Sequence, residues 1–549
     1  SKVKGMKTHK IFAIIFSLAF IASSCGGSDS SSESAEVVET TAAAVETTAA
    51  AVETTAAAVE ESESGDDDES DFREAIVNIL NGLTSDDLGF ANSDYSECIV
   101  DAVHEESGDD YETMMETIMT DDDAYSMAVE DAAIECISVL SDEEFEMLAG
   151  DAGDPLPYAL RVPDDYDTIQ DAVDDALPGD LILIAPGTYY ESVIVETDDL
   201  VIRGLDRNEV IIDGEHERPN GFIVFSNGVA IENLTVHSHT SNGVFFTGDY
   251  GTDIIVDGYR ASYVTAYNNG LYGIYAFNAQ NGVFEHSYGS GHPDSGFYIG
   301  QCNPCNAVID NVISEHNALG YSGTNASDNI VIMNSIFRHN RLGVVPNTLD
   351  SEELAPQGNI TVVGNLVTDN GNEETPRRSA DWDIGFGVGI VAAGGNDNLI
   401  VRNRVENNSY AGIALSIFFD QNLWEANGNT VIENVVSGSE FDLAYVSIVE
   451  EDGTYGSKGN CFSDNTFTTS APADIETFMP CDGEATNTTD TAIPNPDANV
   501  GDGFGRVDYD TMPVPSEQPS MPDADTAEGV PAGPPPSIDI DSIGVPSAE

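Results

Sequence analysis

The chain has 549 residues, of which 98 are acidic and only 18 are basic, so its formal net charge is −80 at pH 7. This balance excludes a nucleic-acid-binding protein, because that affinity rests on cationic side chains that neutralise phosphates. It also disfavours contact with anionic lipid heads and acidic polymers unless cations bridge the two. The length allows two to four domains.

Residues 1–24 have the composition of an export signal. Four lysines precede an apolar stretch, 11–22, that is too short to span a bilayer as a helix. Small residues and Cys25 follow, which resembles a bacterial lipoprotein signal, although Ala22 stands where that family prefers a larger aliphatic residue. The resemblance implies an extracytoplasmic protein, at the cell surface or in the periplasm, whose only membrane contact is a lipid on Cys25. The alternative is an ordinary cleaved signal with a free product.

Two further segments precede the main body. Residues 25–71 are low in complexity, since Glu-Thr-Thr-Ala-Ala-Ala-Val recurs three times, and we expect a disordered tether. Residues 72–150 show helical spacing of apolar side chains and are expected to form a small α-helical domain. The tripeptides around Cys98 and Cys136 echo each other, which suggests two similar helical hairpins joined by a disulfide.

The other cysteines also fit an exported protein, in which disulfides persist. Without Cys25, six remain, and six allow 15 pairings. Locality favours three of them: Cys98 with Cys136, Cys302 with Cys305, and Cys461 with Cys481. For Cys302 and Cys305, half a metal site or a redox pair is the alternative, but no second Cys-x-x-Cys completes a zinc site and no thioredoxin-like context surrounds this one.

Residues 160–482 carry the strongest pattern. A short amphipathic helix, 167–177, stops at Pro178-Gly179 and precedes apolar strands, so we expect it to cap the open end of a β-solenoid. A coil of three short strands needs about 22 residues. A glycine followed by an apolar residue recurs at spacings of 22, 30, 23, 24, 23, 46 and 23. The positions are Gly221, Gly243, Gly273, Gly296, Gly320, Gly343, Gly389 and Gly412.

We interpret the spacings of 30 and 46 as loops added to a coil, or as one coil skipped. Asparagines accompany the repeat, and their side chains tolerate left-handed turns and can stack from coil to coil. A β-propeller would need repeats of roughly 40–45 residues. The fold predicted from this pattern is an all-β domain of stacked coils with an N-terminal capping helix, behind the small disulfide-linked helical domain. Residues 483–549 are rich in Pro, Gly and Asp and are expected to be a disordered tail.

The segment TIQDAVDDALPGDLILIAPGTYYESVIV and the glycine and asparagine coils resemble the pectate-lyase-like right-handed parallel β-helix superfamily, including its carbohydrate-binding and sugar-hydrolase repeat group. The resemblance covers about 320 residues. It implies a single-stranded right-handed parallel β-helix, and it is specific for the fold rather than for one activity.

Two files of side chains follow from the repeat. Four residues before the glycines stand His239, Asn269, His292, His316, His339 and Asn408. Adjacent coils stack about 4.8 Å apart, so His292, His316 and His339 are predicted to form a row. One interpretation is a structural polar ladder. The other is a site that uses the imidazoles as bases or metal ligands, with Asp294, Arg338 and Arg341 as partners.

The second file lies two residues after the glycines and contains Phe245, Tyr275 and Tyr298, followed by Ser322 and Val345. Because strand side chains alternate, these aromatics point outward if their apolar neighbours point inward. Outward stacked rings suit the apolar faces of sugars. Arg260 is a candidate partner for a uronate carboxylate, with a salt bridge to Asp257 or Asp253 as its structural alternative.

Recognition of an extracellular, uronate-type polysaccharide, with or without cleavage or epimerisation, is therefore the first functional hypothesis. Many lyases of the superfamily resembled use a basic residue with calcium, but Lys458 is the only lysine after Cys25 and is remote from the aromatics. Related epimerases carry Asp-Pro-His-Asp, of which His292-Pro293-Asp294 is a faint echo. The candidate catalytic residues are His292, Asp294, His316, His339 and Arg341, with Ca²⁺ as a candidate cofactor. The second hypothesis is a non-catalytic accessory or structural β-helix protein, for which the histidine row is a candidate metal site.

Overall fold

The computed structural model divides the chain into two compact units, Ser1–Tyr158 and Ala159–Glu549. It describes scattered residues between 73 and 156, and then 158–248, 254–379, 385–448, 456–483 and 507–548. The expected signal segment 1–24, the tether 25–71 and Cys25 lie outside the described residues. In the part that is described, no helix is both long and apolar enough to cross a membrane.

The described residues of the first unit are helical. Helix α4 (Ser93–Ser107) buries Tyr95, Ile99 and Val103, which share one face at helical spacing. The predicted disulfide joins Cys98 of this helix to Cys136, which begins the short 3₁₀ helix η2 (Cys136–Val139).

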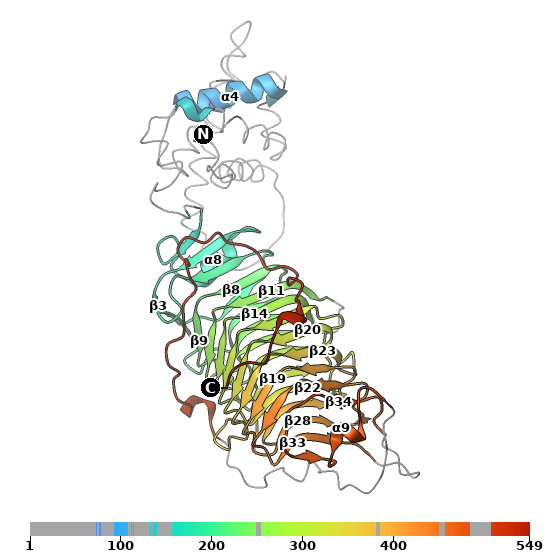
Figure 1. Cartoon of the computed structure of the whole chain (residues 1–549). Helices are drawn as coiled ribbons and strands as arrows, with labels where there is room; N and C mark the ends of the chain where they lie inside the picture. The colour runs from blue at the N-terminus through green and yellow to red at the C-terminus, as the bar shows by residue number, and fades with distance from the viewer. Residues whose placement is uncertain are drawn as a thin grey trace, which may run out of the picture. The chain divides into compact units, whose positions relative to one another are not determined.

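The second unit begins with the expected cap. Helix α8 (Ile169–Asp175) starts where the Thr168 hydroxyl accepts a hydrogen bond from the backbone N–H of Asp171, which is a standard N-cap. Its apolar face, with Ile169, Ala172 and Val173 buried, packs on the first strands, and Figure 1 shows the helix at the beginning of the strand stack. The helix thus covers the end of the solenoid.

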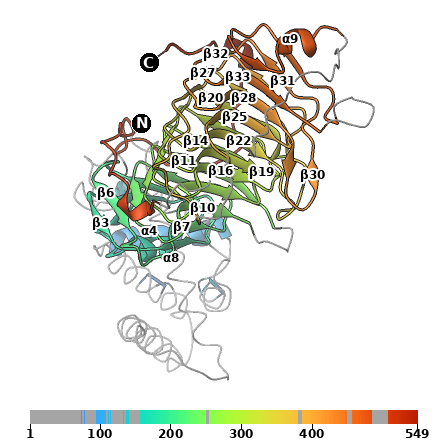
Figure 2. The same cartoon turned by 90° about the horizontal axis from the view of Figure 1, so that it is seen from below.

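Behind the cap, the chain winds through three parallel sheets, named A, B and C, and returns to each sheet once per coil (Figures 1 and 2). Sheet A has 12 strands: β1 (Leu160–Val162), β2 (Leu181–Ile184), β5 (Val201–Gly204), β8 (Val229–Glu232), β11 (Val256–Ser262), β14 (Ala279–Glu285), β17 (Ala307–Asp310), β20 (Ser327–Met333), β23 (Gly358–Val363), β26 (Leu399–Val401), β31 (Thr430–Ile432) and β34 (Cys461–Ser463).

Sheet B has ten strands: β3 (Gly187–Tyr189), β6 (Val210–Asp213), β9 (Thr235–His237), β12 (Thr265–Tyr267), β15 (Tyr288–Ser290), β18 (Ile313–Glu315), β21 (Ile336–Arg338), β24 (Leu366–Thr368), β27 (Arg404–Glu406) and β32 (Val435–Ser437). Sheet C has 11: β4 (Val193–Val195), β7 (Asn220–Val224), β10 (Asn242–Thr247), β13 (Ile274–Phe277), β16 (Ser295–Gly300), β19 (Leu319–Thr324), β22 (Leu342–Asn347), β25 (Val388–Ala393), β28 (Ala411–Ser416), β33 (Phe441–Val446) and β35 (Ser470–Ala471).

A small antiparallel hairpin, β29 (Phe418–Phe419) with β30 (Leu423–Trp424), projects from one coil, and the short helix α9 (Ile475–Phe478) closes the far end. The predicted disulfides Cys302–Cys305 and Cys461–Cys481 are both present. The Cys302–Cys305 bridge closes a turn between β16 and β17, so these cysteines form the structural pair rather than half a metal site.

The glycine repeat positions the core. The residue after each of the eight repeat glycines points into the coil on sheet C and is fully buried, and Leu443 continues the same register after Asp442. These residues are Phe222, Val244, Ile274, Phe297, Tyr321, Val344, Ile390, Ile413 and Leu443. Strand β22 pairs directly with β25, so the spacing of 46 skips no coil. It contains two inserted segments instead, 348–357 and 369–387.

The C-terminal tail differs from the expectation. Residues 507–548, named the strap here, run along the β-helix as extended chain with two single 3₁₀ turns, η4 (Tyr509–Thr511) and η5 (Ile540–Ser542). Figure 1 shows the strap as the dark red trace beside the coils. Arginines of sheets A and B and their connecting turns donate hydrogen bonds to strap carbonyls, as Arg207 does to Pro519 and Arg402 to Ile540. The composition suggested disorder because prolines have no backbone N–H and prevent regular structure. In the strap, the backbone carbonyls instead accept hydrogen bonds from side chains of the β-helix.

Apolar contacts fix the second half of the strap. Ile538, Ile540 and Ile543 pack on outward-facing side chains of sheet A, namely Val308, Met333, Val363 and Val401. These strands are apolar on both faces, which is typical of parallel sheets that are covered on both sides. The interior of the coil thus covers the inner face of sheet A, and the strap covers these side chains on its outer face.

Candidate functional site

The outward aromatic file exists as the repeat predicted. Phe245, Tyr275 and Tyr298 are direct partners on β10, β13 and β16 of sheet C. The rings of Phe245 and Tyr275 are nearly parallel, with an interplanar angle of 2° and centroids 4.3 Å apart. Tyr298 meets Tyr275 edge to face at 4.8 Å. Phe245 and Tyr275 are half-buried, whereas Tyr298 is buried. The rings are therefore partly accessible at the Phe245 end of the row and covered at the Tyr298 end.

An ion pair between a buried carboxylate and an accessible arginine lies beside this row. Asp294 stands in the turn before β16, and its Oδ2 is 2.5 Å from Nε of Arg378. The Arg378 guanidinium also donates a hydrogen bond to the Tyr272 hydroxyl and lies over that ring, 5.2 Å from its centroid. Burial raises the pKa of Asp294, and the cation of Arg378 opposes this rise. The Asp294 side chain is 4% exposed and that of Arg378 is 39% exposed, so the cation is the accessible member of the pair.

The covered end of the row carries a second acid. The Tyr298 hydroxyl donates a hydrogen bond to Oε1 of Glu352 at 2.8 Å. Burial raises the pKa of the Glu352 carboxyl to about 7, with a smaller contribution from the charge of Asp294. Its other oxygen, Oε2, is buried with no hydrogen-bond partner among the described residues. A carboxyl that titrates near neutrality beside a cation can exchange protons with a bound molecule.

The tyrosine hydroxyls of the cluster are protonated at neutral pH. Burial raises the pKa of Tyr272, Tyr275 and Tyr298 above the ordinary value of 10, and the charge of Glu352 adds to each rise. These groups therefore serve as hydrogen-bond donors and ring surfaces. The name sheet C cluster is used below for Phe245, Tyr272, Tyr275, Asp294, Tyr298, Glu352 and Arg378.

Sequence reasoning missed Tyr272, Glu352 and Arg378. The glycine spacing of 46 was the available signal for the last two of these residues, because it indicated extra chain between two coils, and Glu352 and Arg378 lie in that extra chain. It gave no indication that both segments fold back over earlier coils. Tyr272 directly precedes a repeat glycine, a position that the alternation of strand side chains does not orient.

Of the predicted row of His292, His316 and His339, only the last two lie side by side. His292 belongs to a buried ladder in which each backbone N–H donates to the side chain one coil further on. The ladder members are His239, Asn269, His292, Asn317, Asn340, Asn370 and Asn408. Burial lowers the pKa of His292 to about 4, and its ring nitrogens face the backbone carbonyls of Ala266 and Asn269. His292 is thus a structural ladder residue, not a base.

A shorter turn explains why His316 and His339 were wrongly aligned with His292. In the coils of Gly320 and Gly343 the ladder residue stands three rather than four positions before the glycine. His316 and His339 therefore move to the preceding left-handed position, with φ of 59° and 54°. Their rings point out of the coil and stack on each other, with centroids 5.4 Å apart and an interplanar angle of 18°.

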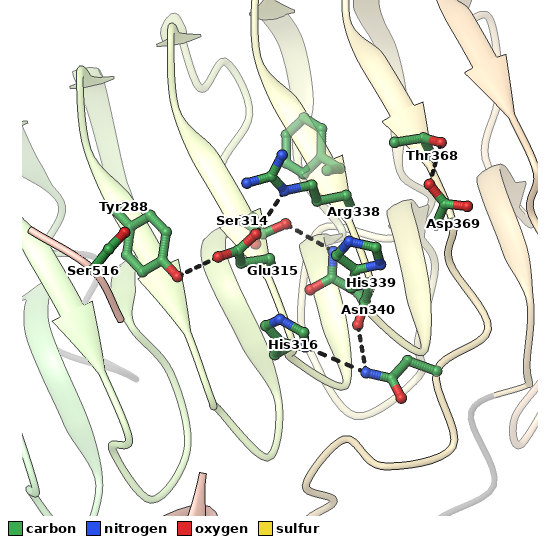
Figure 3. Close-up of polar contacts among 12 residues, drawn as sticks. Tyr288, Ser314, Glu315, His316, Arg338, His339, Asn340, Thr368, Asp369 and Ser516 are labelled. Atoms are coloured by element: carbon green, nitrogen blue, oxygen red, sulfur yellow. Dashed lines mark hydrogen bonds and ion pairs between the residues drawn. The ribbon is translucent and has the colours of Figure 1, made fainter. Parts of the chain in front are cut away.

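Figure 3 shows this histidine corner, where sheet B turns into sheet C. Arg338 Nε is 2.6 Å from Oε2 of Glu315, and the Tyr288 hydroxyl donates to Oε1 of Glu315 at 2.6 Å. Within the residues described, no group of three or more His, Cys, Asp or Glu side chains converges as a metal site would require. Since only His316 and His339 stack, the row of three histidines that the second hypothesis offered as a candidate metal site is not formed.

Arg338 lies at this corner, but the other two arginines singled out from the sequence, Arg260 and Arg341, have structural partners. Arg260 is on sheet A, where Nη2 is 2.7 Å from Oε1 of Glu232 and donates to the strap carbonyl of Val530. Arg341 is buried, donates to the carbonyl of Gly385 at 3.0 Å and lies over the ring of Phe386. Arg260 therefore lies on a different sheet from the aromatic row for which it was a candidate, and its ion pair is with Glu232 rather than with Asp257 or Asp253.

Residues 220–373 match the family described as "Right handed beta helix region". The second unit is a right-handed parallel β-helix. This settles the fold and the hand of the coils, as the resemblance implied. The match covers well under half of the chain and does not include Arg378. No curated protein matches the chain.

Among solved structures, the β-helix is similar to the A-module of mannuronan C-5 epimerase AlgE4 from Azotobacter vinelandii, with 16% identity over 55% of this chain and 90% of that chain and a TM-score of 0.39. Pectate lyase Pel9A gives 14% identity over 63% and 87%, with a TM-score of 0.36. PfbA, a surface adhesin of Streptococcus pneumoniae, gives 12% over 57% and 91%, with a TM-score of 0.30. At such identities no activity is carried over to this chain.

Proposed function

We propose that the β-helix binds an extracellular, uronate-type polysaccharide on the outer face of sheet C and acts on it by proton transfer, as a lyase or an epimerase. One observation carries this proposal. The Asp294–Arg378 pair and the Tyr298–Glu352 hydrogen bond flank one end of a continuous row of outward aromatic rings.

Recognition follows from the two ends of the row. The half-buried rings of Phe245 and Tyr275 offer a stacked platform for the apolar face of a sugar. Arg378 is the part-exposed cation beside it and suits a uronate carboxylate, since guanidinium and carboxylate make paired, charge-assisted hydrogen bonds. In this role Arg378 takes the place that the sequence had suggested for Arg260.

The chemistry follows from Glu352. Lyases and epimerases of uronates both begin by removing the proton on the carbon next to the carboxylate, which requires a base whose pKa lies near the working pH. Glu352 has a pKa of about 7 and stands next to the hydroxyl of Tyr298. Arg378 would stabilise the negative charge that develops on the uronate when the proton leaves. Delivery of a proton to the opposite face by a second acid, for which a tyrosine hydroxyl of the cluster is the candidate, gives the epimer. Departure of the neighbouring linkage oxygen, which takes up a proton as its bond to the sugar breaks, gives an unsaturated product instead.

The test is a panel of uronate polymers offered to the purified protein, with and without Ca²⁺, because the net charge of −80 repels acidic polymers unless cations bridge them. Binding is measured by calorimetry, cleavage by ultraviolet absorbance of the unsaturated product, and epimerisation by proton NMR of the polymer. Tyr275→Ala removes a ring of the aromatic row, and Tyr190→Ala is its control, because Tyr190 is 52% exposed and lies outside the row. Binding that survives Tyr275→Ala unchanged contradicts the proposal.

The proposal includes the setting of the protein, a lipid anchor on Cys25 outside the cytoplasmic membrane. Its support is the lysine-rich start, the short apolar stretch and the small residues before Cys25. Expression in a bacterial host with a labelled fatty acid tests it. We expect label on the parent and none on Cys25→Ser, and equal labelling of both proteins would contradict the anchor.

A further inference from the structure

The histidine corner holds one end of the segment that delivers Arg378. The segment leaves β24, and the backbone N–H groups of Gly371 and Asn372 donate to the carbonyl of Asn340. The Asn372 side chain then lies against both histidines: its Nδ2 donates to the His339 carbonyl at 3.0 Å and is 3.4 Å from Nδ1 of His316. Figure 3 shows His316 and His339 side by side at this corner.

The hydrogen bonds around Asn372 orient its NH₂ group toward His316. The Asn372 Oδ1 accepts from the backbone N–H of Glu374 at 2.9 Å, so the other end of the amide is its NH₂ group. That NH₂ has two hydrogens, and one is directed to the His339 carbonyl, which can only accept. The second is available to Nδ1 of His316, 3.4 Å away, which accepts it in the tautomer that carries no proton on this nitrogen. A doubly protonated imidazole has donors at both nitrogens and cannot make this contact.

The segment continues from this corner to the sheet C cluster. Pro376 pairs with Val507 at the start of the strap, and two residues later Arg378 bonds Asp294 and Tyr272. The anchor at Asn372 and the functional end at Arg378 are thus parts of one short piece of chain. A change at the first is transmitted to the second through six residues.

We propose that His316 is a positioning residue whose neutral imidazole anchors segment 369–379 and so keeps Arg378 over Asp294 and Tyr272, and that protonation of His316 releases this anchor in acid. The release of the segment stands on the contacts above alone. Its effect on a polysaccharide rests on the proposed function of the sheet C cluster.

The charges that face His316 fit this role. Burial lowers the pKa of the imidazole below its ordinary value of 6.5, Glu315 raises it, and His339 and Arg338 lower it. The ring is therefore neutral at pH 7 and becomes cationic only in acid. At that point Nδ1 turns from an acceptor into a donor opposite the Asn372 amide, and a charge appears beside Arg338.

Hydrogen exchange tests the anchor without any ligand. Amide exchange in peptides covering 369–379 is measured at about pH 7.5 and about pH 5 and corrected for the intrinsic pH dependence of exchange. In the parent we expect protection at neutral pH and about tenfold less in acid. His316→Gln keeps a side-chain acceptor that does not titrate, so its protection is expected to be the same at both pH values. His316→Lys presents only a cationic donor and should be unprotected at both.

His286 supplies the matched control. Its Nδ1 is 2.6 Å from the Asn311 amide nitrogen, a similar contact at an exposed corner that holds no inserted segment. His286→Gln should therefore keep the pH step of the parent in peptides 369–379. A parent without a pH step, or a His316→Gln variant that retains it, overturns the proposal.

Binding of a uronate oligosaccharide separates the two proposals. If the cluster binds it, the parent should lose affinity in acid about tenfold more than His316→Gln, whereas the titration of Glu352 affects both equally. If exchange shows the step but no uronate binds, the proposed function fails and the anchor stands. If a uronate binds while exchange shows no step, the anchor fails and the function stands.

Discussion

The hydroxyl of Tyr298 donates a hydrogen bond to Glu352 across 2.8 Å, although the two residues belong to different coils. Tyr298 is a strand residue whose place the repeat dictates, whereas Glu352 arrives on an inserted segment. The contact therefore joins the regular part of the fold to its irregular part, and the sheet C cluster is built at this junction.

Replacing Glu352 by Gln should change how stability depends on pH. The folded-state pKa of Glu352 is raised from 4.5 to about 7, so between these values the folded protein holds a proton that the unfolded chain releases. Its contribution to stability is thus largest at low pH and falls as pH rises through this window. In Glu352→Gln that fall is absent, and the stability of the variant relative to the parent should increase from pH 4.5 to 7.

Urea unfolding at a series of pH values measures this difference. A constant difference across the window would show that Glu352 titrates normally. Asp350→Asn provides the comparison, because Asp350 lies on the same inserted segment but its pKa is lowered, chiefly by the Asn422 side chain.

Removing the ring of Tyr275 should weaken polysaccharide binding more than it weakens the fold. Tyr275 stacks on both Phe245 and Tyr272, with centroids 4.3 Å apart in each pair, yet it remains half-buried. A lost aromatic contact is worth about 1 kcal/mol, or roughly a fivefold loss of affinity. Calorimetric titration of Tyr275→Ala against Tyr275→Phe, which keeps the ring, measures it. Equal weakening in both variants would point to the hydroxyl instead.

His292→Asn should be tolerated, and His292→Ala should not. Asparagine occupies the ladder positions on either side, Asn269 and Asn317, so it can accept the N–H of Asn269 as the imidazole does. Alanine leaves that buried donor unpaired and opens a cavity, which costs about 2–4 kcal/mol. Thermal unfolding distinguishes the two variants. Loss of catalysis in a stable His292→Asn protein would restore the catalytic role first inferred from the sequence.

The strap should contribute to stability through its isoleucines. Ile540 packs on the apolar outer face of sheet A, whereas Val514 of the same strap is 71% exposed. We expect Ile540→Asn to lower the free energy of unfolding by about 1–2 kcal/mol and Val514→Asn to leave it unchanged. Truncation after residue 506 should expose the whole apolar surface and increase binding of a hydrophobic dye. Identical melting of all these proteins would show that the strap is not a structural cover.

The regular part of the fold follows from the sequence because a period of about 23 residues makes each position predict the next. The row of Phe245, Tyr275 and Tyr298 and the inward residues after the glycines are placed by that period alone. His316 shows where the method fails, since one deleted turn residue moved it from the buried ladder to the surface.

Arg378 shows a second kind of failure. It lies on an inserted segment, and its position depends on side chains of earlier coils rather than on its own place in the period. The strap shows a third kind of failure. Its ordered conformation depends on hydrogen-bond donors of the coils, such as Arg207 and Arg402, and not on its own composition.

The strap also restricts how this protein can change in length. In most solenoids each repeat touches only its neighbours, so repeats can be gained or lost without disturbing distant ones. Here a single extended chain is fastened to coils near both ends, at Arg203 and at Arg404, and its contacts have a fixed separation along the peptide. Inserting one coil between these fastenings would stretch them apart by about 4.8 Å. The fixed length of the strap between these two contacts therefore limits the number of coils that can lie between them.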